Sequence, residues 1–258
     1  IAKESNQLIE QYSLDKIGTG YIEALTREWQ PIADLRLSAK DANESKTMNT
    51  HLHVLEAYTN LFSVWKDVKL KASIAGLLQN FVEHIIDHQK GHLHLFFDEE
   101  WKVKSEIVSY GHDIEAAWLL CEAAGSIGDE KMLHEIRGLS IKLANGALEG
   151  IDRDGGLWYE KENGSLVRQK HSWPQAEALV GFFNAWQLSG NEKFLDHVLN
   201  SWKFIKKYIL DKENGEWFWG INGDHSIMQG QDKAGFWKCP YHNSRACLEI
   251  INRIGLIT

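Results

Sequence analysis

Histidine and glutamate recur at one spacing in separate parts of this sequence. The four repeated spacings are His53-x-x-Glu56, His112-x-x-Glu115, Pro174-x-x-Glu177 and His242-x-x-Arg245. Residues three apart on a helix share one face, so each pair presents its two side chains together. Imidazole serves as acid or base near neutral pH, and a neighbouring carboxylate can fix its tautomer. These residues therefore indicate proton-transfer chemistry at a shared site.

Tryptophans accompany these positions. A single histidine at the start of a helix is more often a capping or packed residue, but three histidines and three glutamates at equivalent positions argue against coincidence. Trp118, Trp173 and Trp237 flank them, and the chain holds eleven tryptophans in all. An indole ring packs well on the apolar face of a sugar, although the same rings could simply fill a core. We expect a carbohydrate substrate.

An internal repeat of helix pairs must position these residues. Residues 115–133 (EAAWLLCEAAGSIGDEKML) match residues 177–195 (EALVGFFNAWQLSGNEKFL) at a constant offset of 62. Each copy begins with an apolar helix, breaks at Gly128-Asp129 or Gly190-Asn191, and enters a second amphipathic helix. Such a repeat predicts an all-α fold.

Two further copies extend the repeat. One has a first helix ending near Trp65, a break at Lys66-Asp67 and a second helix at about 68–87, and another begins at His242. Short strand signals, typical of hairpins at the ends of helix pairs, occur at 21–25, 94–97, 157–159 and 217–219. Stacked helix pairs form an open solenoid or a closed ring. Small residues on the first helices, such as Ala116, Ala117 and Gly181, favour a closed α/α toroid.

Composition narrows the class of protein. The formal charge of −8 argues against nucleic acid or an anionic membrane as a partner. Three cysteines without metal-ligand spacing are typical of a reducing compartment. No apolar run approaches the roughly 20 residues that cross a bilayer. We expect a cytoplasmic protein, and the sequence leaves its oligomeric state open.

Four segments around the repeated positions carry a resemblance. They are NTHLHVLEA (49–57), SYGHDIEA (109–116), WPQAEA (173–178) and WKCPYHN (237–243). In this order they resemble the N-acylglucosamine 2-epimerase superfamily, and SYGHDIE is most similar to its cellobiose 2-epimerase branch. The resemblance covers essentially the whole chain. It implies an (α/α)6 barrel, in agreement with the toroid inferred from the repeat.

The resemblance also implies an activity. Cellobiose 2-epimerases invert C2 of the reducing-end glucose in β-1,4-linked disaccharides, without a redox cofactor and without a metal. By resemblance, His112 and His242 remove and return the C2 proton, His53 assists ring opening, and Glu115 orients or polarises. The residues implied to line the substrate pocket are Asn49, Trp118, Trp173, Glu177 and Trp237.

The family also uses an arginine from its first helices, which this sequence does not contain at a matching position. Arg27, in a predicted hairpin, is not a convincing substitute. Ile1–Leu14 already has the pattern of a helix interior, and four partial repeats cannot close a ring of six helix pairs. We therefore expect residues 1–258 to form one partial barrel domain, with an N-terminal third outside this sequence.

Other functions remain open. An N-acylglucosamine 2-epimerase or an aldose–ketose isomerase would share proton abstraction at C2. A glycoside hydrolase would use two carboxylates, for which Glu115 and Glu177 are the candidates. A metal site would draw on His51-x-His53 or His92-x-His94. A non-catalytic carbohydrate-binding protein would bind sugar without needing His112 or His242.

Overall fold

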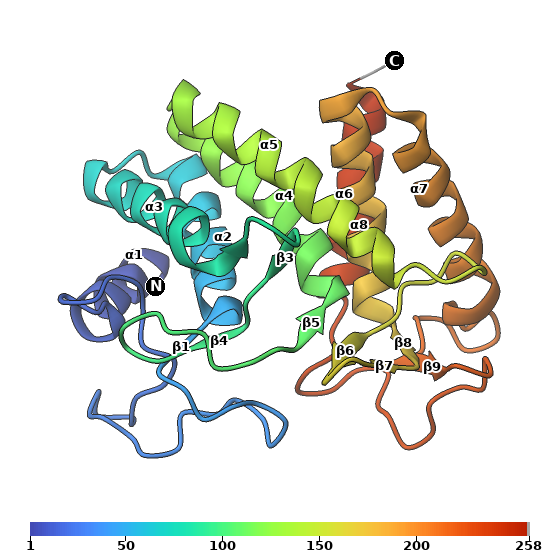
Figure 1. Cartoon of the computed structure of the whole chain (residues 1–258), viewed down its shortest axis with the longest axis horizontal. Helices are drawn as coiled ribbons and strands as arrows, with labels where there is room; N and C mark the ends of the chain where they lie inside the picture. Colours follow the sequence, from blue (N-terminus) through green and yellow to red (C-terminus); the bar gives the residue numbers. More distant parts are fainter. Residues whose placement is uncertain (257–258) are drawn as a thin grey trace. The chain divides into compact units, whose positions relative to one another are not determined.

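The computed structural model describes residues 1–256, which are mostly helical with short strands (Figure 1). The helices are α1 (Ala2–Leu8), α2 (Met48–Val64), α3 (Val68–Asn80), α4 (Tyr110–Ile127), α5 (Glu130–Ala147), α6 (Ser172–Ser189), α7 (Glu192–Phe204) and α8 (Tyr241–Gly255). The strands are β1 (Lys46–Thr47), β2 (Ile86–Asp87), β3 (His92–Leu93), β4 (Phe96–Phe97), β5 (Val108–Ser109), β6 (Glu160–Glu162), β7 (Ser165–Val167), β8 (Gln169–His171) and β9 (Gly220–Asn222). The prediction of an all-α protein with small hairpins is confirmed.

Residue contacts divide the chain into two compact units. The first comprises Ile1–Gln89, Leu93–Ile107 and Leu119–Ile136, and the second comprises Lys90–His92, Val108–Trp118 and Arg137–Thr258. The single-domain organisation expected from the sequence stays a prediction. Among residues 1–256, no helix has both the length and the hydropathy needed to span a bilayer.

The first unit is built around the α2–α3 helix pair. The Thr47 side chain caps α2 by accepting the Thr50 backbone N–H at 3.1 Å. Asp67 caps α3 by accepting from the backbone of Lys69 and Leu70. The predicted break at Lys66-Asp67 is therefore confirmed. Apolar side chains of both helices, including Leu52, Leu55, Ile74 and Leu78, are buried between them.

In the second unit, α6 packs against both α7 and α8 (Figure 1). Gly190 ends α6 with a left-handed φ of 66°, and the Asn191 side chain then caps α7. This break also falls where the sequence predicted it. Helix α6 is buried around nearly its whole circumference, as an inner helix requires. Gly181 allows α6 to approach Ile114 of α4 closely.

Two small sheets of the second unit precede its inner helices. Strand β5 pairs antiparallel with β6, with Ser109 opposite Glu160, and leads directly into α4. Strand β8 pairs with β9, with His171 opposite Gly220, and leads into α6. These sheets hold the first turns of α4 and α6, where the repeated residues lie.

The strand predictions were displaced by a few residues. The segments 157–159 and 217–219 form only isolated bridges, at Leu157 and Trp217, and the regular strands begin at Glu160 and Gly220. Strands β7 and β8 were missed because residues 160–170 are largely polar and lack an apolar alternation. Backbone pairing between strands, which leaves little trace in side-chain pattern, stabilises them instead.

A buried ion pair between His92 and Asp113 stabilises the first turn of α4. The His92 Nδ1 lies 2.7 Å from Asp113 Oδ2, and the His92 Nε2 lies 3.5 Å from Glu149. Burial works to lower the pKa of His92, but the hydrogen bond and charge of Asp113, with the charge of Glu149, outweigh it and raise the pKa. The protonated imidazole therefore stabilises the fold.

We expect Gly181→Ala to destabilise the protein. An added Cβ would overlap the Ile114 carbonyl oxygen and lie 2.5 Å from Ile114 Cγ1. Helices α4 and α6 must move apart to avoid this overlap, which should lower the free energy of unfolding by roughly 1 to 3 kcal/mol. Chemical denaturation measures this free energy. The matched control is Gly138→Ala on α5, where nothing lies within 4 Å of the added methyl, so helix propensity should raise stability slightly.

We expect His92→Gln to lower stability more at pH 6 than at pH 9. A raised pKa means that the charged imidazole contributes fully below its unfolded value of about 6.5, and that this contribution is lost as pH rises through the folded pKa. The deficit at pH 6 should be roughly 1 to 3 kcal/mol. Urea unfolding at both pH values tests this, with the exposed His134→Gln as control. An equal deficit at both pH values would contradict it.

Candidate active site

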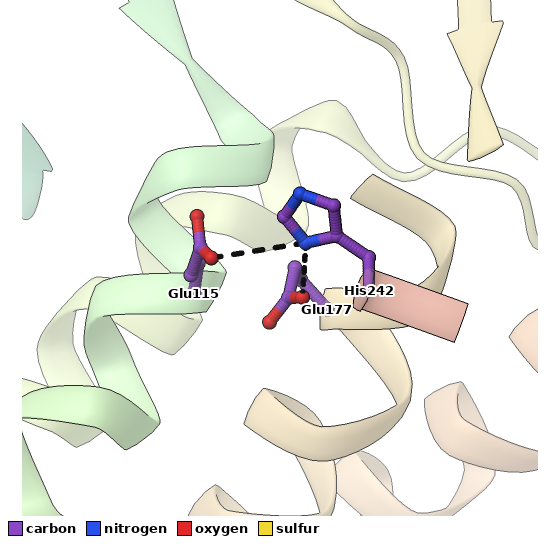
Figure 2. Close-up of side chains that lie close together, drawn as sticks. All are labelled: Glu115, Glu177 and His242. Carbon is purple, nitrogen blue, oxygen red and sulfur yellow. Dashed lines mark hydrogen bonds and ion pairs between the residues drawn. The ribbon is translucent and has the colours of Figure 1, made fainter. Parts of the chain in front are cut away.

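His242, Glu177 and Glu115 converge from three helices of the second unit (Figure 2). The Nδ1 of His242, on the first turn of α8, lies 2.7 Å from Glu177 Oε1 on α6. The same nitrogen lies 3.9 Å from Glu115 Oε1 on α4. A carboxylate only accepts hydrogen bonds, so Glu177 holds the proton of His242 on Nδ1. Glu177 and Glu115 precede His242 by 65 and 127 positions in the sequence, and the fold brings the three side chains together.

Glu177 is the common partner of this site. Besides His242, it accepts hydrogen bonds from the Trp118 indole Nε1 at 2.9 Å and from the Arg245 guanidinium at 2.7 Å. Arg245 also donates to Glu115 Oε1 at 2.9 Å. Both carboxylates are fully buried, where each requires a compensating charge. We call these five residues the Glu177 cluster: Glu115, Trp118, Glu177, His242 and Arg245.

The charge state of Glu177 follows from its partners. Burial works to raise the pKa of this carboxyl, but the hydrogen bond from His242 and the positive charge of Arg245 outweigh it. The pKa therefore lies below its ordinary value. Glu177 is therefore ionised at neutral pH and accepts the hydrogen bond from His242 as a carboxylate.

His112 and His242 contact the same indole ring. The Trp173 ring centroid lies 4.7 Å from that of His112 and 5.5 Å from that of His242. Trp173 reaches this place because Gly111 has no side chain, since a Cβ there would lie 2.5 Å from the indole. The His112 Nδ1 is 2.8 Å from the Ser109 hydroxyl. His112 and His242 thus contact the same indole, and their role as a catalytic pair stays a prediction.

A pocket of about 130 Å³ opens beside His242. Its wall includes four tryptophans, Trp173, Trp217, Trp219 and Trp237, with Tyr241 next to His242. The sequence predicts Trp173 and Trp237 at this pocket, but not Trp217 and Trp219. These two belong to segment 217–219, for which the sequence predicts only a hairpin strand. A cleft with this many indole faces is suited to stacking on sugar rings.

Trp118 differs from its expected role. It was predicted to line the substrate pocket, but its side chain is only 1% exposed. Its indole donates to Glu177, and the Arg245 guanidinium lies over its ring at 4.9 Å. Trp118 therefore supports the Glu177 cluster from within the protein. Glu177, also predicted to contact substrate, is buried and contacts His242 and Arg245.

His53 and Asn49 lie on α2, in the first unit. His53 Nδ1 is 3.3 Å from Glu56, as the repeated spacing predicted. His53 is the sixth residue of α2, whereas His112 is the third of α4 and His242 is the second of α8. The repeat equivalence is therefore shifted by about one helical turn at His53. Roles for His53 and Asn49 in the site stay predictions.

The ligand atoms of Glu115, Glu177 and His242 lie within 4.8 Å of one another, a spacing that could suit a metal ion. The Arg245 guanidinium, however, bonds to both carboxylates and supplies the positive charge there. His51, a candidate in the metal alternative, has both ring nitrogens engaged, by the Thr47 carbonyl at 2.6 Å and the Tyr21 N–H at 2.9 Å. Burial lowers the pKa of His51 to about 4, so it is a neutral structural residue.

Comparison with known proteins identifies the family of this chain. The sequence profile of the N-acylglucosamine 2-epimerase (GlcNAc 2-epimerase) family matches residues 10–246. Cellobiose 2-epimerase of Bacteroides fragilis is 51% identical over 245 residues, which cover 94% of this chain and 62% of that protein. Cellobiose 2-epimerase of Dictyoglomus turgidum is 40% identical, with 98% of this chain and 65% of that protein covered.

The fold agrees as well. The structure of cellobiose 2-epimerase from Bacillus thermoamylovorans matches with a TM-score of 0.91 and 40% identity, over 97% of this chain and 64% of that one. The chain thus spans less than two thirds of these relatives' length, and the expected partial α/α barrel is confirmed. The protein belongs to the N-acylglucosamine 2-epimerase family, in its cellobiose 2-epimerase branch.

Proposed function

We propose that the protein containing this chain epimerises C2 of the reducing-end glucose in β-1,4-linked disaccharides such as cellobiose. The observation that carries the proposal is the placement of His112 and His242 against one indole, beside a tryptophan-lined pocket. The names of the relatives, which are cellobiose 2-epimerases, support the choice of substrate.

Epimerisation makes a specific demand on the site. The C2 proton is acidic only in the open-chain aldehyde, so the sugar ring must first open. Removal of the proton then gives a planar enediolate, and the product forms when a proton returns to the opposite face. Two imidazoles on either side of the reacting carbon meet this demand, since each can act as acid or base near neutral pH. We assign these roles to His112 and His242.

The Glu177 cluster supports His242 in this role. The buried carboxylate fixes the imidazole orientation and stabilises the imidazolium that forms when His242 accepts a proton. Arg245, bonded to both carboxylates, prevents their mutual repulsion and keeps Glu177 ionised. Glu115 lies farther away, at 3.9 Å from His242 Nδ1. It acts indirectly, because it shares the positive charge of the Arg245 guanidinium with Glu177.

The tryptophans would hold the sugar units. Trp237 is 61% exposed on the loop that leads into α8, and it lines the pocket together with Trp173. Stacking holds the unreacting sugar while the reducing end changes from ring to open chain. His53 and Asn49 are assigned to ring opening and hydroxyl binding by family resemblance.

The arrangement of carboxylates disfavours a glycoside hydrolase. Glu115 and Glu177 are fully buried and both bond to the same guanidinium nitrogen of Arg245. A hydrolase needs its two carboxyl groups to face each other across a glycosidic bond. Here both carboxylates point toward an arginine within the protein.

Incubation of the full-length protein with cellobiose in D2O tests the proposal. We expect an epimer with mannose at the reducing end, carrying deuterium at C2, without hydrolysis to glucose. The label arises because a proton held on imidazole exchanges with solvent. His112→Asn and His242→Asn should each lower kcat by about 10²- to 10⁴-fold. Nuclear magnetic resonance reads both product and label, and glucose release without label would contradict the proposal.

Trp237→Ala tests the stacking role separately from the proton transfer. An aromatic contact of this kind contributes about 0.5 to 1.5 kcal/mol, so KM for cellobiose should rise roughly 2- to 10-fold with little change in kcat. Trp202→Ala is the matched control, because this tryptophan is 38% exposed on α7 and does not line the pocket. An unchanged KM in Trp237→Ala would show that its indole does not hold the sugar.

A further inference from the structure

The two imidazoles of the proposed pair have chemically different partners. His242 Nδ1 lies 2.7 Å from a buried carboxylate oxygen of Glu177. His112 Nδ1 lies 2.8 Å from Oγ of Ser109, a neutral hydroxyl. A carboxylate favours the imidazolium strongly, whereas a hydroxyl orients the ring without supplying a charge. Ser109 lies on the strand that precedes α4, whereas Glu177 lies within α6.

Ser109 occupies a rigid position. It is the last residue of β5, opposite Glu160 on β6, and α4 begins at the next residue. Its side chain is fully buried. A serine immediately before a helix is ordinarily interpreted as an N-cap, which would be a purely structural role. Here the hydroxyl lies 2.8 Å from Nδ1 of His112, which gives it a partner in the site.

We infer that Ser109 is a positioning residue that accepts the Nδ1–H of His112 and so keeps the lone pair on Nε2. The inference rests on the proposed epimerase function, in which His112 must act as a base. A neutral imidazole has two tautomers, and only the one protonated on Nδ1 has a basic Nε2. Trp173, tilted 48° against the ring, restricts its rotation further.

In both rings the partner of Nδ1 sets the tautomer, because Glu177 accepts the Nδ1–H of His242 and Ser109 accepts that of His112. Inversion at C2 needs one group that removes a proton and another that supplies one on the opposite face.

Three substitutions separate positioning from capping. Ser109→Ala removes the hydroxyl and, with it, the capping ability of serine. Ser109→Gly keeps most of the capping energy, since glycine at this position costs only a few tenths of a kcal/mol, but it lacks the hydroxyl. Ser109→Thr keeps both. The matched control is Ser201→Ala, which removes a fully buried serine hydroxyl that bonds to the Gly155 carbonyl away from the site.

In the full-length protein, positioning predicts that kcat falls about tenfold in both Ser109→Ala and Ser109→Gly, with KM little changed, because one hydrogen bond is lost. Ser109→Thr should retain activity, and Ser201→Ala should retain kcat. If Ser109→Gly has wild-type kcat while Ser109→Ala is merely less stable, the serine is only a cap and the inference is overturned.

A second measurement does not depend on turnover. Long-range ¹H–¹⁵N spectra of the histidine side chains, with the His112 signals assigned from His112→Asn, report which ring nitrogen carries hydrogen. We expect protonated Nδ1 in the wild type and a mixture of tautomers in Ser109→Gly. Hydrogen on Nε2 in the wild type would overturn the inference. An inactive wild type with the expected Nδ1 signal would instead contradict the proposed epimerase function.

Discussion

One buried carboxylate, that of Glu177, holds the site together. It accepts hydrogen bonds from Trp118 on α4 and from His242 and Arg245 on α8, while itself belonging to α6. Three helices are therefore fixed to one another by groups that cannot be left unpaired. Burying this charge is costly without those partners, so the helices must meet in the register that supplies them. The position of the His242 ring is a consequence of that register.

Two buried lysines also require charged partners, and each lies just before the first residue of an inner helix. Lys170, two residues before α6, is fully buried and bonds to Asp152 at 2.7 Å and to Asp154 at 2.6 Å. In the first unit Lys46, two residues before α2, is also fully buried and bonds to Asp15 at 2.7 Å. In each case the aspartates lie in a turn that follows an outer helix. A charge pair thus ties the end of one repeat to the start of an inner helix.

Much of this architecture was predictable from the sequence. Helix pairs, their breaks and the convergence of His112, Glu115, Glu177 and His242 followed from the repeat, because a constant offset places equivalent residues on equivalent faces. The strands β6 to β8 were not predictable, since backbone pairing rather than apolar pattern defines them. The burial of Trp118 was not predictable either, because spacing places a residue near a site but does not say whether its ring faces solvent or protein.

The second position of the repeat departs from glutamate once, and this departure changes the charge of the site. Three of the four spacings end in glutamate, and the fourth ends in Arg245. Had the repeat been kept, a third carboxylate would face Glu115 and Glu177 in a buried site, with no cation within the Glu177 cluster except a protonated His242. Mutual repulsion would then force protons onto the carboxyls and remove the acceptor that His242 requires. The departure from the repeat therefore allows the two repeated glutamates to remain charged.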